Sequence, residues 1–242
     1  GDPKSHPIWR NESVCLKCTK QLVKLANATK KDIHILHITT AEEIELLNKN
    51  KKFISYEVTP QHLVLSSPSC YNKLGTLAQM NPAIRSSRHQ NRLRKALKNN
   101  EIDIIGSDHA PHTLSEKKQK YPDSPSGMPG VQTLMPLLLN EVSKKTISIT
   151  NVVELTSFNP IKRFKVKDKG LIKEGFDADF TFVDLSMTKK ISNKLIKSKC
   201  GWTPFHGMKV TGWPVGTMIN GNKVFWNEKI IGKPIGKPVK FN

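Results

Sequence analysis

The stretch EIDIIGSDHAPHT, residues 101–113, places one carboxylate and two imidazoles directly after an apolar segment. Asp108, His109 and His112 lie within five residues of one another, behind a run of β-forming residues. Such a run is typical of a buried strand, and ionisable side chains that follow it are delivered to the edge of a sheet. In α/β folds the active site forms where the C-terminal ends of parallel strands converge.

Two further predicted strands also end in polar side chains. Residues 32–38 end near His37, and residues 52–58 contain Glu57 before the chain turns toward His62. Histidine and carboxylate ligands, with no Cys at comparable positions, are typical of Zn²⁺ or a similar divalent ion that keeps an open coordination position. The pattern therefore indicates a metal-dependent hydrolase.

Each of these residues also has a structural interpretation. A single strand-end His such as His37 is more often a hydrogen-bonded core residue, and Asp108 could cap a helix or form a turn. For His62 and His109, a supporting or structural role is favoured over metal binding. The remaining histidines lack a convergent partner in the pattern: His6, His89 and His206.

The alternation of helices and strands predicts an α/β fold. Helices are expected at 12–29, after Asn11 as N-cap, at 41–50, at 86–100 and from residue 130 onward. Because these helices alternate with the three strands, we expect right-handed βαβ units and a parallel sheet.

The character of the sequence changes after residue 150. A last helix is expected at 151–164, and short strands punctuated by Gly follow it, which predicts an antiparallel, sandwich-like appendage. We therefore divide the chain into residues 1–160, a metal-dependent hydrolase domain, and residues 161–242, a β-sandwich-like appendage with a Gly/Pro/Lys-rich tail.

The composition restricts the class of protein. No segment reaches the roughly 18 apolar residues of a membrane span. No secretion signal is recognised, so the four Cys are expected as reduced thiols of a cytoplasmic protein. Cys15 and Cys18 form a C-x-x-C pair, but their helical context and the lack of a second pair favour helix packing. The net charge is +19, yet 33 of the 39 basic residues are scattered Lys, which disfavours a dedicated nucleic-acid surface.

Several motifs resemble the metal-dependent dihydroorotases of the cyclic amidohydrolase superfamily, and they follow one another along nearly the whole chain. They are HILHITTAEE, EVTPQHLVL, QMNPAIRS, GSDHAPHTLSEK, SPSGMPGVQT, GLIKEGFDADFTFVDL and TPFHGMKVTGWPVGTMINGNKVF. Ala83 stands where the family more often has a second Pro. Asn81 together with His112 favours the dihydroorotase branch over allantoinase-like and dihydropyrimidinase-like relatives.

The resemblance implies roles for individual residues. Asp108 would be both a metal ligand and the catalytic acid/base, which takes a proton during attack on the cyclic amide carbonyl and passes it to the leaving nitrogen. His37 would be a further metal ligand. The residues implied to hold the dihydroorotate ring and its carboxylate are Asn81, His112, Ser126 and Gly127.

The resemblance also implies a partial barrel. The three strand–helix units look like the last three of a (β/α)8 TIM-like barrel, and a complete barrel needs roughly 250 residues. The family's H-x-H strand and its bridging carboxylate or modified Lys have no counterpart in this sequence. We therefore expect the C-terminal portion of a dihydroorotase, inactive alone, whose one or two Zn²⁺ ions take their remaining ligands from the N-terminal half.

The expected reaction is the reversible cyclisation of N-carbamoyl-L-aspartate to dihydroorotate in pyrimidine biosynthesis, so the expected partner is a small-molecule substrate. One alternative is hydrolysis of another cyclic amide, of the allantoinase or hydantoinase type. Another is a non-catalytic amidohydrolase-like subunit of a carbamoyltransferase complex. The resemblance allows a homo-oligomer or a carbamoyltransferase partner, and no membrane association is expected.

Overall fold

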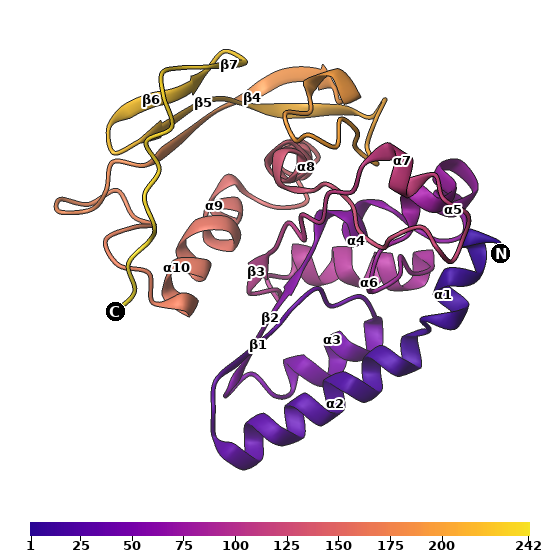
Figure 1. The fold of residues 1–242 in the computed structure, drawn as a ribbon. Coiled ribbons are helices and arrows are strands. Elements are labelled where there is room, and N and C mark those ends of the chain that lie inside the picture. Colours follow the sequence, from indigo (N-terminus) through magenta and orange to yellow (C-terminus); the bar gives the residue numbers. More distant parts are fainter. The chain divides into compact units, whose positions relative to one another are not determined.

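The computed structural model describes residues 1–242 and divides them into two compact units (Figure 1). The first unit contains Gly1–Leu134 and Ile191–Met208, and the second contains Met135–Lys190 and Lys209–Asn242. These limits differ from the predicted boundary at residue 160. The segment 191–208 belongs with the first unit because its Trp202 is buried there and donates a hydrogen bond from Nε1 to the carbonyl of His112.

The first unit is built on a parallel sheet of three strands in the order β1-β2-β3. Their bounds are β1 Ile33–Ile35, β2 Ile54–Val58 and β3 Ile104–Ile105. Parallel pairing of β1 with β2, and of β2 with β3, confirms the predicted α/β arrangement. The strands are shorter than predicted, and His37 and Asp108, with φ of 42° and 41°, lie in the left-handed region beyond the ends of β1 and β3.

Helices of the first unit begin at local capping signals. The Asn11 side chain accepts from the amide of Val14 at the start of α2, and Thr40 forms a capping box with Glu43 at the start of α3. Helix α2 packs against α3, and α3 packs against α6 (Figure 1). The helical elements are η1 Pro3–Ser5, α1 His6–Trp9, α2 Glu12–Thr29, α3 Ala41–Asn48, α4 Pro60–Val64, α5 Ser69–Leu74, η2 Gly75–Ala78, α6 Ser87–Lys98 and α7 Leu114–Lys117.

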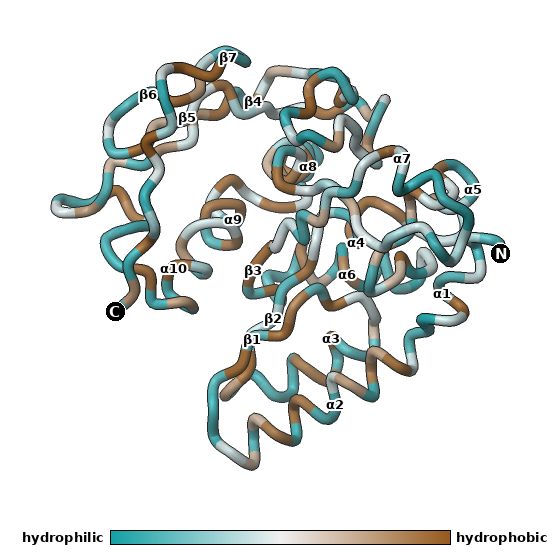
Figure 2. The backbone as a smooth tube through the Cα atoms, in the orientation of Figure 1, coloured by the Kyte–Doolittle hydropathy of each residue, from teal (hydrophilic) through white to brown (hydrophobic).

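The buried residues of the first unit lie on the parallel strands and in the segments that follow the strands. Figure 2 shows hydrophobic residues along β1 to β3 and an alternation of hydrophobic and hydrophilic residues along α2. A further apolar cluster lies among the loop segments and is buried from solvent. Its larger members are Tyr71, Met80, Ile84, Met128 and Trp202.

The second unit contains helices and one antiparallel sheet, in the order β4-β5-β6-β7. Its helices are most of α8 Val131–Ser143, α9 Ile149–Val153, the π-helix η3 Glu154–Phe158 and α10 Asn159–Phe164, and its strands are β4 Phe180–Lys190, β5 Lys209–Ile219, β6 Asn222–Trp226 and β7 Lys229–Ile230. The predicted antiparallel strands are therefore present, as a single sheet without a second facing sheet. None of the helices in either unit has the length and apolar character needed to cross a bilayer.

Candidate active site

Two predicted site residues lie immediately beyond the parallel strands. His37 follows β1 and Asp108 follows β3, and both have a positive φ although neither is Gly. A left-handed backbone at such a residue is sterically unfavourable and is often retained at functional sites. The backbone N–H of Ile38 donates to the carbonyl of Glu57 at 2.8 Å, which ties the end of the first strand to the second.

The electrostatic surroundings of Asp108 include the other two strand ends. Burial raises the pKa of the Asp108 carboxyl above its usual value; the nearby His37 opposes this rise and Glu57 adds to it. The pKa of Asp108 is raised overall, so the carboxyl holds its proton more readily than an exposed Asp. The structure therefore brings His37 and Glu57 within electrostatic reach of Asp108.

Glu57 is held in place by contacts that the sequence analysis did not identify. Its Oε2 lies 3.2 Å from Nε2 of His34, whose Nδ1 contacts Ser55 Oγ at 2.8 Å. A Cβ on Gly106 would lie only 2.3 Å from Glu57 Oε1, so the carboxylate rests against the third strand. The contact between His34 and Glu57 follows from the register of β1 and β2, in which His34 pairs with Ser55. The sequence indicates this contact only after the two strands have been aligned.

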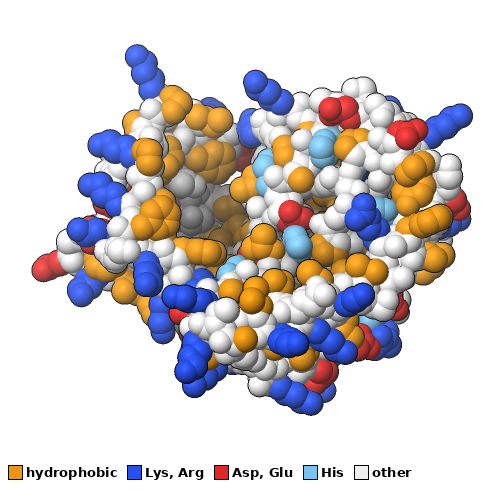
Figure 3. All heavy atoms as spheres, turned by 60° about the horizontal axis from the view of Figure 1, so that its bottom comes forward, with side chains coloured by type: hydrophobic (Ala, Val, Ile, Leu, Met, Phe, Trp, Pro, Cys, Tyr) orange, Lys and Arg blue, Asp and Glu red, His pale blue; other side chains and the backbone are white.

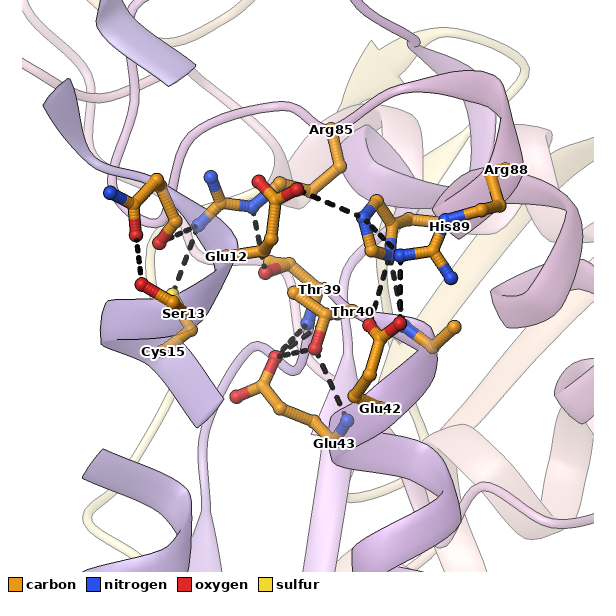
Figure 4. A network of polar contacts seen from close by, with 12 residues as sticks. Glu12, Ser13, Cys15, Thr39, Thr40, Glu42, Glu43, Arg85, Arg88 and His89 are labelled. Atoms are coloured by element: carbon orange, nitrogen blue, oxygen red, sulfur yellow. Dashed lines mark hydrogen bonds and ion pairs between the residues drawn. The ribbon is translucent and has the colours of Figure 1, made fainter. Parts of the chain in front are cut away.

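The segment after His37 is fixed by a buried polar network (Figure 4). The Glu43 carboxylate accepts from the backbone amides of Thr39 at 3.3 Å and Thr40 at 3.0 Å. Arg85 donates to Thr39 Oγ1 at 3.3 Å and contacts Cys15 Sγ at 3.0 Å. Cys15 and Cys18 are both free thiols on α2; Cys15 is half-buried and Cys18 is exposed, so the predicted role in helix packing does not extend to Cys18.

Three loops meet beside Asp108 and carry the predicted substrate-binding residues. The backbone of Ala110 donates to the carbonyl of Met128 at 3.1 Å, and Gly127 donates to the carbonyl of Gln79 at 2.9 Å. Gly127 has φ of 146°, and a Cβ there would lie 2.7 Å from the carbonyl oxygen of Ala110. Because the loops approach so closely, this position requires Gly.

His112 and Ser126 are in direct contact within this loop cluster. Nε2 of His112 lies 3.2 Å from the carbonyl oxygen of Ser126. A carbonyl oxygen only accepts, so Nε2 carries the proton and Nδ1 faces away from this bond. Trp202 donates from Nε1 to the carbonyl of His112 at 2.8 Å, which fixes the loop from its other side.

Asn81 has a partner that the sequence analysis did not predict. His6 is buried, and its Nε2 lies 2.9 Å from the carbonyl oxygen of Met80 and 3.2 Å from Asn81 Oδ1. These contacts join residues more than seventy positions apart, so no local pattern could indicate them. Asn81 itself remains exposed.

His62 and His109, for which supporting roles are predicted, both contact the backbone of the site loops. His62 is buried, pairs with Thr59 Oγ1 at 2.8 Å and donates to the carbonyl of Pro82 at 3.0 Å. Burial lowers the pKa of His62 to about 3, so its ring is neutral. His109 Nδ1 accepts from the amide of Gly130 at 3.1 Å, at the start of α8.

The donor set at the strand ends is partial. His37 offers an imidazole nitrogen and Asp108 a carboxylate oxygen, both of which suit Zn²⁺. No group of three or more His, Cys, Asp or Glu side chains that could hold a metal ion is present in residues 1–242. On the face shown in Figure 3, His and single acidic side chains lie between hydrophobic ones, while Lys and Arg project outward.

Curated relatives of this chain are dihydroorotases. The dihydroorotase of Pyrococcus furiosus is 38% identical over 225 residues, which cover 93% of this chain and 52% of that protein. The dihydroorotase of Methanosphaera stadtmanae is 35% identical over 231 residues, which cover 90% of this chain and 53% of that protein. The chain thus spans about half the length of the curated relatives it matches.

Solved structures with the same fold include a hydantoinase and a dihydropyrimidinase. An L-hydantoinase (dihydropyrimidinase) from Arthrobacter aurescens matches with a TM-score of 0.85 and 27% identity over 90% of this chain and 50% of its own. A dihydropyrimidinase from Brevibacillus agri matches with a TM-score of 0.88 and 25% identity over 96% of this chain and 52% of its own. The amidohydrolase family model matches residues 12–224. With a family match across most of its length and these structural neighbours, the chain belongs to the amidohydrolase family.

Proposed function

We propose that this chain carries part of the active site of a dihydroorotase, which interconverts dihydroorotate and N-carbamoyl-L-aspartate in the cytoplasm. The observation that supports this most directly is the loop cluster beside Asp108. It joins the segments that carry Asn81, His112 and Ser126 through the bonds from Gly127 to Gln79 and from His112 to Ser126. Dihydroorotases are also the relatives matched over most of the chain.

In this proposal Asp108 moves the proton. Burial raises its pKa, which makes the Asp108 carboxylate a better proton acceptor than an exposed Asp. During hydrolysis, the oxygen of a water molecule bonds to the amide carbon while Asp108 accepts a proton from that water. The ring C–N bond then breaks, and the nitrogen leaves with the proton that Asp108 returns. The Asn81 carboxamide and the His112 imidazole orient the ring and its carboxylate.

His37 and Asp108 are proposed as zinc ligands. When bound there, Zn²⁺ would polarise the amide carbonyl and lower the pKa of the attacking water. A catalytic zinc usually takes three protein ligands. We therefore propose that the remaining ligands come from a segment equivalent to the half of the dihydroorotase relatives that this chain does not match. In that assembly β1 to β3 are the last three strands of a (β/α)8 barrel, and the antiparallel sheet is one layer of a sandwich.

The proposal is tested by dihydroorotate turnover in the presence of Zn²⁺. The 242-residue chain is assayed alone and mixed with the unmatched half of the Pyrococcus furiosus relative. We expect turnover only in the mixture, and a fall of about 10²–10⁴-fold with Asp108→Asn. Asp123→Asn, which removes an exposed carboxylate, is the matched control and should retain full activity. Turnover that survives Asp108→Asn would contradict the assigned role.

A second candidate is hydrolysis of hydantoins, because solved structures of similar fold include hydantoinases. The same assay separates the two functions when hydantoin and allantoin are offered beside dihydroorotate. Preference for a ring without a carboxylate would favour the hydantoinase type. Equilibrium dialysis measures zinc binding to the chain and to His37→Ala. The comparison of the two zinc affinities examines the proposed metal ligand separately from turnover.

A further inference from the structure

His6 is a buried histidine with three polar neighbours, although it lies in the short helix α1 and far from the parallel sheet in sequence. Its side chain is 3% exposed. Nε2 lies 2.9 Å from the carbonyl oxygen of Met80 and 3.2 Å from Asn81 Oδ1, and Nδ1 lies 3.4 Å from the hydroxyl of Tyr121. The rings of His6 and Tyr121 meet edge to face at 5.7 Å.

These contacts determine which ring nitrogen carries the proton. The carbonyl oxygen of Met80 can only accept a hydrogen bond, so Nε2 must donate. Nδ1 is then free to accept from the hydroxyl of Tyr121. Burial lowers the pKa of His6, while the bonds to Met80 and Asn81 oppose this shift. Near neutral pH the ring is therefore neutral with its proton on Nε2.

The proton on Nε2 also determines the orientation of the Asn81 carboxamide. The N–H at Nε2 is shared between two acceptors, the carbonyl oxygen of Met80 and Oδ1 of Asn81. If the carboxamide were rotated by half a turn, its NH₂ group would face the Nε2 proton, and two donors would oppose each other. Oδ1 is therefore held toward His6, and Nδ2 is the group that the exposed Asn81 can offer to a ligand.

We propose that His6 is a positioning residue that presents the Nδ2 hydrogens of Asn81, rather than Oδ1, to an oxygen of the substrate. This inference rests on the proposed function, because it takes Asn81 as a substrate-binding residue. Two N–H donors complement a carboxylate oxygen, and hydrogen bonds to an ionised acceptor are stronger than those to the neutral carbonyl oxygens of an uncharged ring. His6 would thus favour a cyclic amide that bears a carboxylate over an uncharged cyclic amide.

The first test uses side-chain NMR of the full 15N-labelled chain with two substitutions. His6→Leu removes the donor, whereas the side-chain amide of His6→Gln can still donate to the same acceptors. The resonances of the Asn81 Nδ2 hydrogens, assigned by their loss in Asn81→Asp, should shift in His6→Leu and return toward wild type in His6→Gln. Long-range 1H–15N spectra of the wild type should place the imidazole proton on Nε2. A proton on Nδ1, or Asn81 resonances unmoved by His6→Leu, would overturn the inference.

The second test measures binding of L-dihydroorotate and hydantoin to the same proteins, each mixed with the unmatched half of the Pyrococcus furiosus relative, in the presence of Zn²⁺. Losing one oriented hydrogen-bond donor weakens binding by about five- to tenfold. We expect this loss for dihydroorotate with His6→Leu, recovery with His6→Gln, and little change for hydantoin. Equal weakening by both variants would show a merely structural role. If the wild type does not bind dihydroorotate, the proposed function fails, while the Asn81 resonances still decide the role of His6.

Discussion

Lys117 permits a quantitative test of the forces that hold the loop cluster. Its side chain is fully buried, and Nζ donates to the carbonyl of Gln79 at 2.9 Å and to that of Pro125 at 2.7 Å. Burial lowers the pKa of Lys117 to about 8. Replacing Lys117 with Met keeps much of the side-chain volume but removes the titrating group.

The sign of the effect follows from proton binding. Because the pKa of Lys117 is lower in the folded than in the unfolded chain, the unfolded state binds more protons between these two values, and stability rises with pH there. With a pKa of about 8 in place of 10.5, this one group raises the free energy of unfolding by about 2 kcal/mol between pH 7 and pH 9.5. Cys70, whose pKa burial raises to about 12, contributes with the opposite sign from about pH 9 upward.

Urea unfolding of the wild type, Lys117→Met and Lys118→Met at several pH values isolates the effect of Lys117. The contribution of Cys70 is common to all three proteins and cancels in the differences. The stability of the wild type relative to Lys117→Met should increase by about 2 kcal/mol from pH 7 to pH 9.5. Lys118 is exposed, so its variant should follow the wild type. A difference between wild type and Lys117→Met that stays constant over this range would refute the reasoning.

Three further substitutions examine contacts around the site. Glu43→Leu should lower the free energy of unfolding by about 1–3 kcal/mol in urea, because the buried amides of Thr39 and Thr40 would lose their acceptor at the start of α3. Gly106→Ala should cost about 1–3 kcal/mol, since the new Cβ would lie 2.3 Å from Glu57 Oε1; a melting temperature equal to wild type would argue against this contact. Trp202→Phe leaves the carbonyl of His112 without its donor, so amide hydrogen exchange in that loop should accelerate about fivefold.

Features with a local cause could be predicted from the sequence. Asn11 caps α2 and Thr40 caps α3 because each side chain reaches an amide three residues ahead in its own segment. The apolar run at 52–58 likewise indicates β2, and the alternation of helices and strands indicates parallel pairing. These signals lie within a few residues of the helices and strands that they define, so a single sequence is enough to predict them.

Features that depend on distant contacts could not be predicted in the same way. The run from 101 to 108 predicts a long strand, but the structure has only Ile104–Ile105, because these two residues alone pair with Glu57 and Val58 of β2. His6 was set aside for lack of a partner, and its partners are more than seventy residues away. The assignment of residues 191–208 to the first unit depends in the same way on the burial of Trp202.

The loops of the candidate site are all held by hydrogen bonds from buried side chains to backbone carbonyls. His6, Lys117 and Trp202 are buried, and each donates to a backbone carbonyl at, or within two residues of, a proposed substrate-binding position. Loops without such anchors are mobile, and a mobile site pays an ordering cost whenever a ligand binds. Donors that bind backbone carbonyls remove this cost and leave the Asn and His side chains of the loops available for a ligand. The loop cluster is therefore preorganised by side chains that need not touch the substrate.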